Sequence, residues 1–169
     1  MLVKGDRIID DPFQPVADTD PLPEGPAIVS LKRFKAEAGA LLARRFPLGV
    51  RLETADAPEA LGENVSKLAL IVLHVPHFRD GRAFSQARQL RTRAHYKGEL
   101  RVSGHVLKDQ LAFYARVGVD AFELPRELPL ADIEAALHEI SNVYQPSADG
   151  RTTIQELRSA REQATPRPS

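Results

Sequence analysis

Two arginines flank an aspartate and a glycine in the segment Arg79-Asp80-Gly81-Arg82, which directly precedes a stretch with helical spacing. The N–H groups at a helix N-terminus and the helix dipole favour an anion, and arginine side chains reinforce that preference. The segment therefore predicts a pocket for sulfate, phosphate or a carboxylate. Alternatively, Asp80 is a plain N-cap residue with solvated arginines around it.

More polar side chains follow on the same predicted helix, where Ser85, Gln86, Arg88 and Arg91 lengthen the polar surface. If the anion pocket is present, these residues extend it toward the solvent. From spacing alone, they also fit the solvated face of an ordinary helix.

Two histidines and one glutamate are weak candidates for catalysis or ligation. His74 and His77 have the spacing of a ligand pair, but Pro76 prevents their regular presentation on a helix and no third ligand is close in sequence. We therefore predict no metal site, and interpret the histidines as hydrogen-bonded or pH-sensitive polar groups. Glu123 ends a predicted strand, where it suits a general acid or base; His74 and Glu123 are the catalytic candidates.

The elements that must position these residues alternate along the chain. The aliphatic run 68–75 predicts a strand buried on both faces, followed by a polar loop and a helix from about 81 to 95. Similar patterns predict further strands at 27–30, 50–53, 99–102 and 119–124, and further helices at 31–45, 105–117 and 130–143. The charges of strand 99–102 suggest an edge position. Residues 54–64 read as a loop with about one helical turn.

This alternation indicates an α/β fold with a parallel sheet and helix crossovers. We expect a three-layer open sheet of about five strands, of the flavodoxin-like kind; a half-barrel-like curved sheet is the alternative. If all strands are parallel, their carboxyl ends share one edge, where ligands usually bind. The polar residues expected there are Ser30, Glu53, His74, His77, Ser103, His105 and Glu123.

Proline content divides the chain. Residues 1–26 contain a short apolar start, read as a hairpin or edge strand, and then a Pro-rich arm. Residues 27–145 form the single α/β domain, with Ser30 as N-cap of its first helix. Residues 146–169 form a short helix, opened by a capping box from Thr153 to Glu156, and a disordered tail.

Composition narrows the function classes. The 169 residues are 43% hydrophobic and carry 23 basic and 23 acidic side chains, so bulk electrostatics does not favour nucleic-acid binding. There is no cysteine, which excludes disulfides and thiolate catalysis by this chain. No apolar run is long enough for a membrane span or a signal peptide, so we expect a cytoplasmic protein that binds no membrane. Fingerprints of the GxGxxG, Walker and GxSxG kinds are absent from the sequence.

Several segments together resemble a known bacterial family. They are 78–88, Leu90-Arg91, 96–101, Gly104, 109–111 and 120–124. The chain is similar over about 25–145, most densely over 76–124, to an uncharacterised family whose members are provisionally described as oxidoreductases of sulfite reduction. Their genes typically lie beside assimilatory sulfite reductase and other sulfate-assimilation genes. The family pattern often has a small acidic or amide residue after the glycine, where this chain has His105.

The resemblance implies a functional surface and a set of partners. The implied ligand-binding residues are Arg79, Asp80, Gly81, Arg82, Ser85, Gln86, Arg88, Arg91 and Gly104. The implied partner is sulfite reductase or another enzyme of sulfate assimilation. The cofactor stays unknown, because an oxidoreductase without cysteine or a cofactor fingerprint needs a bound flavin, a nicotinamide or a partner's redox centre.

Three functions remain open. The first is an accessory protein of assimilatory sulfite reduction that binds an anion or a partner reductase through residues 77–91. The second is a small enzyme with an oxyanion or nucleotide at the strand carboxyl ends. The third is a non-catalytic interaction module that forms a homodimer.

Overall fold

The computed structural model describes residues 1–125, 127–140 and 142–164, with the side chains of 162–164 left aside. Its strands are β1 (Leu2–Lys4), β2 (Arg7–Ile9), β3 (Gln14–Pro15), β4 (Ala27–Ser30), β5 (Leu48–Leu52), β6 (Leu70–Val75), β7 (Glu99–Gly104) and β8 (Ala121–Glu123). Its helices are α1 (Leu31–Leu42), the 3-10 helix η1 (Pro58–Lys67), α2 (Arg82–Thr92), the 3-10 helix η2 (Lys108–Gln110), α3 (Leu111–Arg116), α4 (Leu130–His138) and α5 (Ile154–Ala164).

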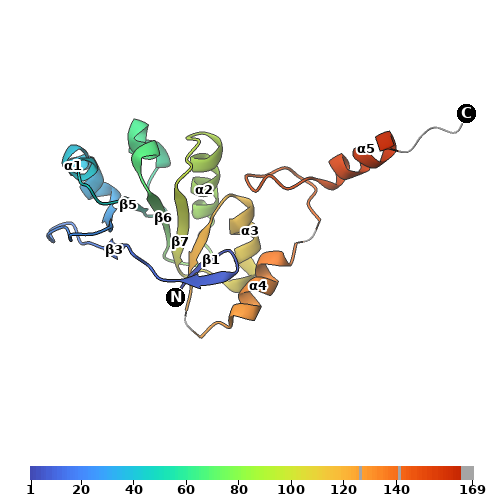
Figure 1. Cartoon of the computed structure of the whole chain (residues 1–169), viewed down its shortest axis with the longest axis horizontal. Helices are drawn as coiled ribbons and strands as arrows, with labels where there is room; N and C mark the ends of the chain where they lie inside the picture. The colour runs from blue at the N-terminus through green and yellow to red at the C-terminus, as the bar shows by residue number, and fades with distance from the viewer. Residues whose placement is uncertain (126, 141, 165–169) are drawn as a thin grey trace, which may run out of the picture.

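The described strands form one sheet in the order β2-β1-β8-β7-β6-β5-β4-β3. From β3 to β8 each strand lies parallel to the next one in the chain, whereas β1 pairs antiparallel with β2 and β8. From β3 to β8 the order never reverses, so right-handed crossovers place the helices between these strands on the same face. The sheet curls into a half-barrel, with α1 and α2 along one side and the N-terminal segment along the other (Figure 1). The half-barrel-like prediction is confirmed, and the flavodoxin-like one is wrong because that fold needs a reversal of strand order.

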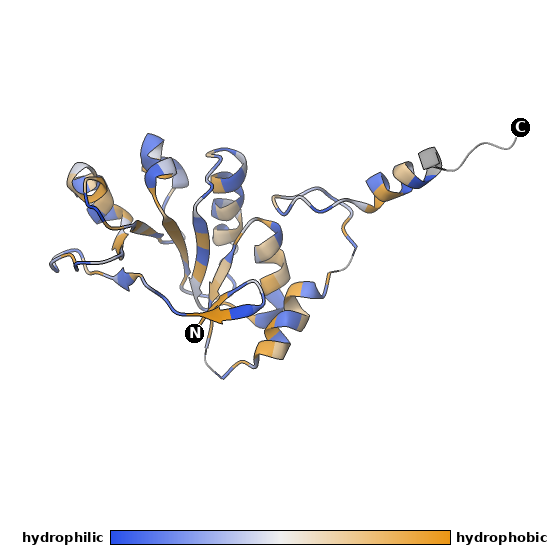
Figure 2. Cartoon of the chain, in the orientation of Figure 1, coloured by the Kyte–Doolittle hydropathy of each residue, from blue (hydrophilic) through white to orange (hydrophobic). Residues whose placement is uncertain are grey.

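The main core lies between the sheet and the helices. It contains Val50, Leu73 and Val102 from the strands and Phe34 and Leu90 from α1 and α2. Hydrophobic residues accordingly gather on the central strands and the inner sides of the helices (Figure 2). None of the described helices is both long and apolar enough to cross a membrane.

A smaller apolar cluster covers the other, concave face of the sheet. Ile28, Leu70 and Val72 are buried there, and Phe13 of the N-terminal arm packs against them. β6 is therefore buried on both faces, as the aliphatic run predicts.

The N-terminal arm crosses the concave face. It starts in the β1–β2 hairpin beside β8 and reaches β4 through β3, where Gln14 pairs with Ala27 (Figure 1). The predicted hairpin is confirmed. The Pro-rich part is an extended strap on the domain, and its proline-containing strand occupies the sheet edge, where a missing N–H is tolerated.

Three element predictions need correction. Strand 99–102 is not at an edge, because β7 lies between β6 and β8. The predicted helix 105–117 is split into the short η2 and α3, and the predicted loop 54–64 contains most of η1.

The predicted caps Ser30 and Thr153 are confirmed, whereas the alternative of Asp80 as N-cap is wrong, because Gly81 is the N-cap residue of α2. The Ser30 hydroxyl accepts a hydrogen bond from the Arg33 N–H at 3.0 Å. Glu156 accepts from the Thr153 N–H at 2.7 Å, while the Thr153 hydroxyl oxygen accepts from the Glu156 N–H at 3.3 Å. The predicted disorder of the final residues 165–169 lies outside the described residues.

Gly104 at the end of β7 requires glycine for two reasons. Its φ is +90°, a region that side chains disfavour, and an added Cβ would collide with the carbonyl oxygen of Val75 and approach the His74 ring. We expect Gly104→Ala to lower the free energy of unfolding by about 1–3 kcal/mol, measured by urea denaturation. In the matched control Gly39→Ala, within α1 and with open space around it, stability should rise by about 0.5–1 kcal/mol. Equal effects of the two exchanges would contradict this reading of Gly104.

Candidate functional site

The carboxyl ends of β4 to β8 share one edge of the sheet, and the register brings two predicted residues together there. His74 lies opposite Ser103, and its Nδ1 is 3.2 Å from the Ser103 hydroxyl. The next loops continue this contact, because the rings of Phe78 and His105 pack edge to face with centroids 5.4 Å apart. His105 therefore packs against an aromatic ring of the neighbouring loop.

Asp80 fills the anion position in front of α2. Its carboxylate accepts the Arg82 N–H at 3.2 Å and binds the Arg82 guanidinium at 2.9 and 2.7 Å. These hydrogen bonds from Arg82, with a smaller contribution from Thr54, hold the pKa of Asp80 well below its ordinary value. An external anion at this point would have to compete with a carboxylate that the chain itself supplies.

Two of the predicted ligand-binding side chains hold the backbone of neighbouring loops. Gln86 is buried, and its amide donates to the carbonyl oxygens of Glu53 and Asp56 at 2.8 Å each. Arg91 donates to the carbonyl oxygens of Gly98 and Gly118 at 3.0 and 2.9 Å, and pairs with Asp120. These contacts fix α2 to its surroundings and occupy groups that spacing alone assigns to a ligand.

A buried tyrosine packs against α2, near the Asp80 carboxylate. Tyr114 of α3 is fully buried and stacks on Phe84 of α2, with centroids 3.9 Å apart. Burial, aided by the negative charge of Asp80, raises the pKa of Tyr114 to about 12, so its hydroxyl stays protonated at neutral pH. Among the described residues this hydroxyl has no hydrogen-bond partner.

The predicted residues Arg79, Ser85 and Arg88 are exposed, and with two exposed aromatic residues they make up what we call the α2 surface: Phe78, Arg79, Ser85, Arg88 and Phe113. Phe78 and Phe113 keep 37% and 55% of their area accessible. A pocket of about 260 Å³ between α2 and α3 includes Arg88 and Phe113 in its lining. Gln110, which directly precedes α3, links this region to the loop before α2 by donating a hydrogen bond to the Phe78 carbonyl oxygen at 2.9 Å.

A second group of charged residues lies on the concave face, and of its members the sequence predicted only Glu123. Arg101 of β7 is 1% exposed. Its guanidinium binds Asp11 of the strap at 2.6 and 3.2 Å, Glu99 at 3.0 Å and Glu123 at 3.2 Å. Lys4 adds a 2.8 Å ion pair with Glu99. Glu123, a predicted catalytic candidate, thus has an ion-pair partner of opposite charge.

The described residues contain no cluster of side chains suited to bind a metal ion. In residues 1–125, 127–140 and 142–164, no three histidine, aspartate or glutamate side chains gather in a way that could hold a metal ion. His74 instead faces a serine hydroxyl.

The Arg101 cluster predicts how the strap is held. Arg101→Met removes a buried cation and leaves three carboxylates facing one another, so the free energy of unfolding should fall by about 3 kcal/mol. Asp11→Asn keeps the shape and removes one charge, and should cost about 1 kcal/mol. Urea denaturation measures both, and hydrogen exchange should show faster exchange in residues 10–16. Unchanged exchange there in Arg101→Met would contradict this role.

The same cluster predicts a dependence of stability on acid. Burial alone would raise the pKa of Glu99, but the hydrogen bonds and charges of Lys4 and Arg101 lower it below its ordinary value of 4.5. A carboxyl with a lowered folded-state pKa stabilises the fold above about pH 4.5, and loses that contribution as the pH falls through the folded pKa.

We therefore expect Glu99→Gln to flatten the decline of the free energy of unfolding below pH 4.5, measured by urea denaturation at a series of pH values. The matched control is Glu59→Gln, at an exposed position of η1. If the free energy of unfolding falls equally steeply with pH in Glu99→Gln and in the unmodified protein, Glu99 does not contribute to the loss of stability in acid.

Comparison with known proteins gives one family. Residues 49–155, more than half of the chain, match the model of a family described as bacterial protein of unknown function (DUF934). The match runs from β5 to the start of α5 and so includes Arg101 and the α2 surface. No curated protein matches the chain. The chain belongs to the bacterial family DUF934, whose function is unknown.

Proposed function

We propose that this protein is an accessory protein of assimilatory sulfite reduction, which binds a partner reductase through the segment 77–91. The observation that carries the proposal is the α2 surface, where exposed Arg79 lies over the Phe78 ring and exposed Arg88 lines a pocket with Phe113. Arginine and aromatic residues are enriched at protein interfaces, and they dominate the binding energy there. The identity of the partner rests on the family resemblance in 76–124.

Geometry favours a protein partner over a small anion at this surface. The position that an oxyanion would take in front of α2 holds the Asp80 carboxylate. Gln86 and Arg91, which would line the rest of the pocket, bind backbone carbonyls. Arg79 and Arg88 project outward, where they can meet acidic side chains of another protein.

The oxidoreductase description of the family fits this proposal if the redox centre belongs to the partner. The chain has no cysteine and therefore offers no thiolate for iron–sulfur ligation or thiol chemistry. We place the protein in the cytoplasm with its partner. Its contribution would be to bind and position the reductase.

The second candidate is a small enzyme with a ligand at the strand carboxyl ends. The contact between His74 and Ser103 favours it, because a half-buried imidazole beside a hydroxyl can move a proton. A thermal-shift screen against sulfite, sulfate, phosphate, flavins and nicotinamide nucleotides separates the candidates. A ligand at 100 times its dissociation constant stabilises by about 2.7 kcal/mol, so a clear rise would support the enzyme.

The third candidate is a homodimeric module. Arg91 gives no support to it, because the Arg91 guanidinium makes its hydrogen bonds within one chain. Only a dimer that covers Arg88 and Phe113 would place the α2 surface between copies.

Charge reversal tests the main proposal. We expect the double variant Arg79→Glu and Arg88→Glu to bind purified assimilatory sulfite reductase at least about tenfold more weakly, measured by biolayer interferometry, because two cations become anions at the interface. The matched control is Arg7→Glu, an exposed arginine on the β1–β2 hairpin. Absence of binding by the unmodified protein, or equal binding by all three proteins, would overturn the proposal.

A further inference from the structure

We propose that a pocket between the strap and the carboxyl ends of β3, β4 and β5 binds a small zwitterion of the amino-acid type, with an aliphatic body. The pocket has a volume of about 440 Å³, within the range of small-molecule sites. It uses no residue of the α2 surface, so it is independent of the function proposed above.

The pocket lies where a parallel sheet usually binds ligands. Pro15, Ser30 and Arg51 in its lining come from the carboxyl-terminal ends of three neighbouring strands. In sheets of consecutive parallel strands, that edge carries the binding loops. Here the strap supplies the remaining wall through the segment 15–18.

Arg51 offers a place for a carboxylate. Its side chain is 47% exposed and pairs with Glu53 at 3.0 Å, an exposed ion pair of the kind that contributes little stability. Exchanging Glu53 for a ligand carboxylate therefore costs little. Arg101, two strands away in the same register row, shows that a carboxylate can bind an arginine on this face, because Asp11 does so.

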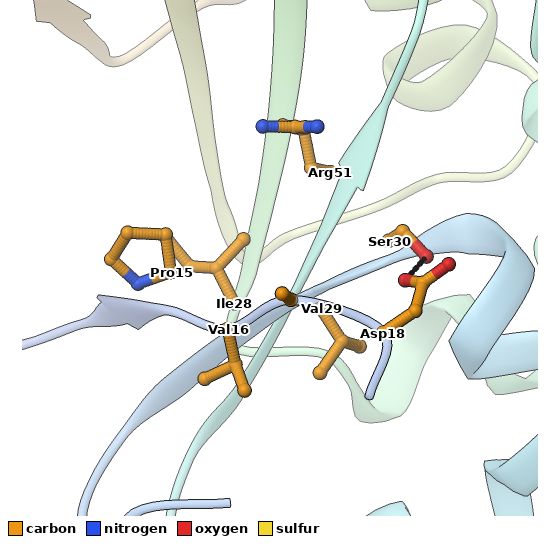
Figure 3. Close-up of a pocket in the computed structure, with 8 residues that line it drawn as sticks. Pro15, Val16, Asp18, Ile28, Val29, Ser30 and Arg51 are labelled. Carbon is orange, nitrogen blue, oxygen red and sulfur yellow. Dashed lines mark hydrogen bonds between the residues drawn. The ribbon is translucent and has the colours of Figure 1, made fainter. Parts of the chain in front are cut away.

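Asp18 offers a place for an ammonium group. One of its oxygens accepts the Ser30 hydroxyl at 2.6 Å, while the other is 3.9 Å from the exposed Lys32 ammonium, a long contact. The hydrogen-bonded Ser30 and Asp18 lie to one side of the pocket, apart from the guanidinium of Arg51 (Figure 3). Charges of opposite sign thus line one pocket, which suits a zwitterion and disfavours a dianion such as sulfate.

The wall that carries Asp18 is held in place without a ligand. Arg33, 9% exposed, donates to the carbonyl oxygens of Ala17 and Asp20 at 2.7 and 2.8 Å. Its own N–H orients the Ser30 hydroxyl. A preformed wall lowers the entropy cost of binding, so a small ligand can bind with few contacts.

Aliphatic side chains set the class of the ligand body. Ile28 and Pro15 lie next to each other in the lining, beside Arg51, and Val16 of the strap adds apolar surface (Figure 3). Val29 borders the pocket too, but it belongs to the main core on the other face of the sheet. Among the described residues no aromatic ring lines the pocket, so stacking with a planar base or flavin has no support here. An aliphatic amino acid such as leucine matches the two charges and the apolar lining.

Calorimetric titration of the full chain with four probes tests this site. The probes are L-leucine, glycine, 4-methylpentanoate without the ammonium group, and 3-methylbutylamine without the carboxylate. We expect leucine to bind at millimolar concentration or better. The acid and the amine should each bind at least about tenfold more weakly, since a lost charge-assisted hydrogen bond amounts to more than one factor of ten. Glycine keeps both charges and should also bind at least about tenfold more weakly, because it has no aliphatic side chain to bury.

Two variants assign the charges. Arg51→Gln should abolish the preference for leucine over the amine, and Asp18→Asn should abolish the preference for leucine over the acid. Arg45→Gln, an exposed exchange just beyond α1 and outside the pocket lining, is the matched control and should bind like the unmodified protein. Thermal unfolding confirms that each variant is folded.

Three results would overturn the site: no binding of leucine, equal binding of the singly charged probes, or preferences that neither variant alters. The reductase-binding experiment distinguishes this failure from failure of the proposed function, because Arg51→Gln and Asp18→Asn leave Arg79 and Arg88 unchanged.

Discussion

A single buried arginine on the concave face of the half-barrel determines how the N-terminal segment is held. Arg101 is 1% exposed and binds three carboxylates, of which Asp11 comes from the strap and Glu99 and Glu123 from the sheet. A buried charge is tolerated only when it is paired and hydrogen-bonded. Asp11 and Phe13 together fasten the strap, by charge at β7 and by packing at β4 and β6.

The strap in turn gives the two faces of the sheet different roles. Consecutive winding places the helices on one face and leaves the other to the strap. The α2 surface belongs to the helical side, whereas the zwitterion pocket lies between the strap and the strand ends. A partner protein and a small ligand could therefore bind without competing for the same residues.

Local features of the fold could be predicted from the sequence, and long-range ones could not. The strand at 68–75 and the caps Ser30 and Thr153 depend on neighbouring residues, and the structure confirms them. β7 is interior because it pairs with β6 and β8, and the partner of its buried Arg101, Asp11, lies 90 residues away in the chain. From neighbouring residues alone, the charges of this strand predict an exposed edge.

The candidate site shows the same limit. Spacing identifies the α2 segment as polar, but it does not separate Arg79 and Arg88, which are exposed, from Gln86, which is buried against loop carbonyls. No sequence pattern marks Arg51 as a site residue, because one charged residue in a short strand is common. Its interest comes from the pocket that it lines together with Asp18, which only the folded strap creates.

Hydrogen–deuterium exchange of this protein, with and without purified assimilatory sulfite reductase, tests the central claim most directly. Binding through the α2 surface predicts slower exchange in peptides that cover 77–91 and the start of α3, with residues 14–30 unchanged. Protection confined to the strap side, or no protection anywhere on the chain, would contradict the proposed mode of binding.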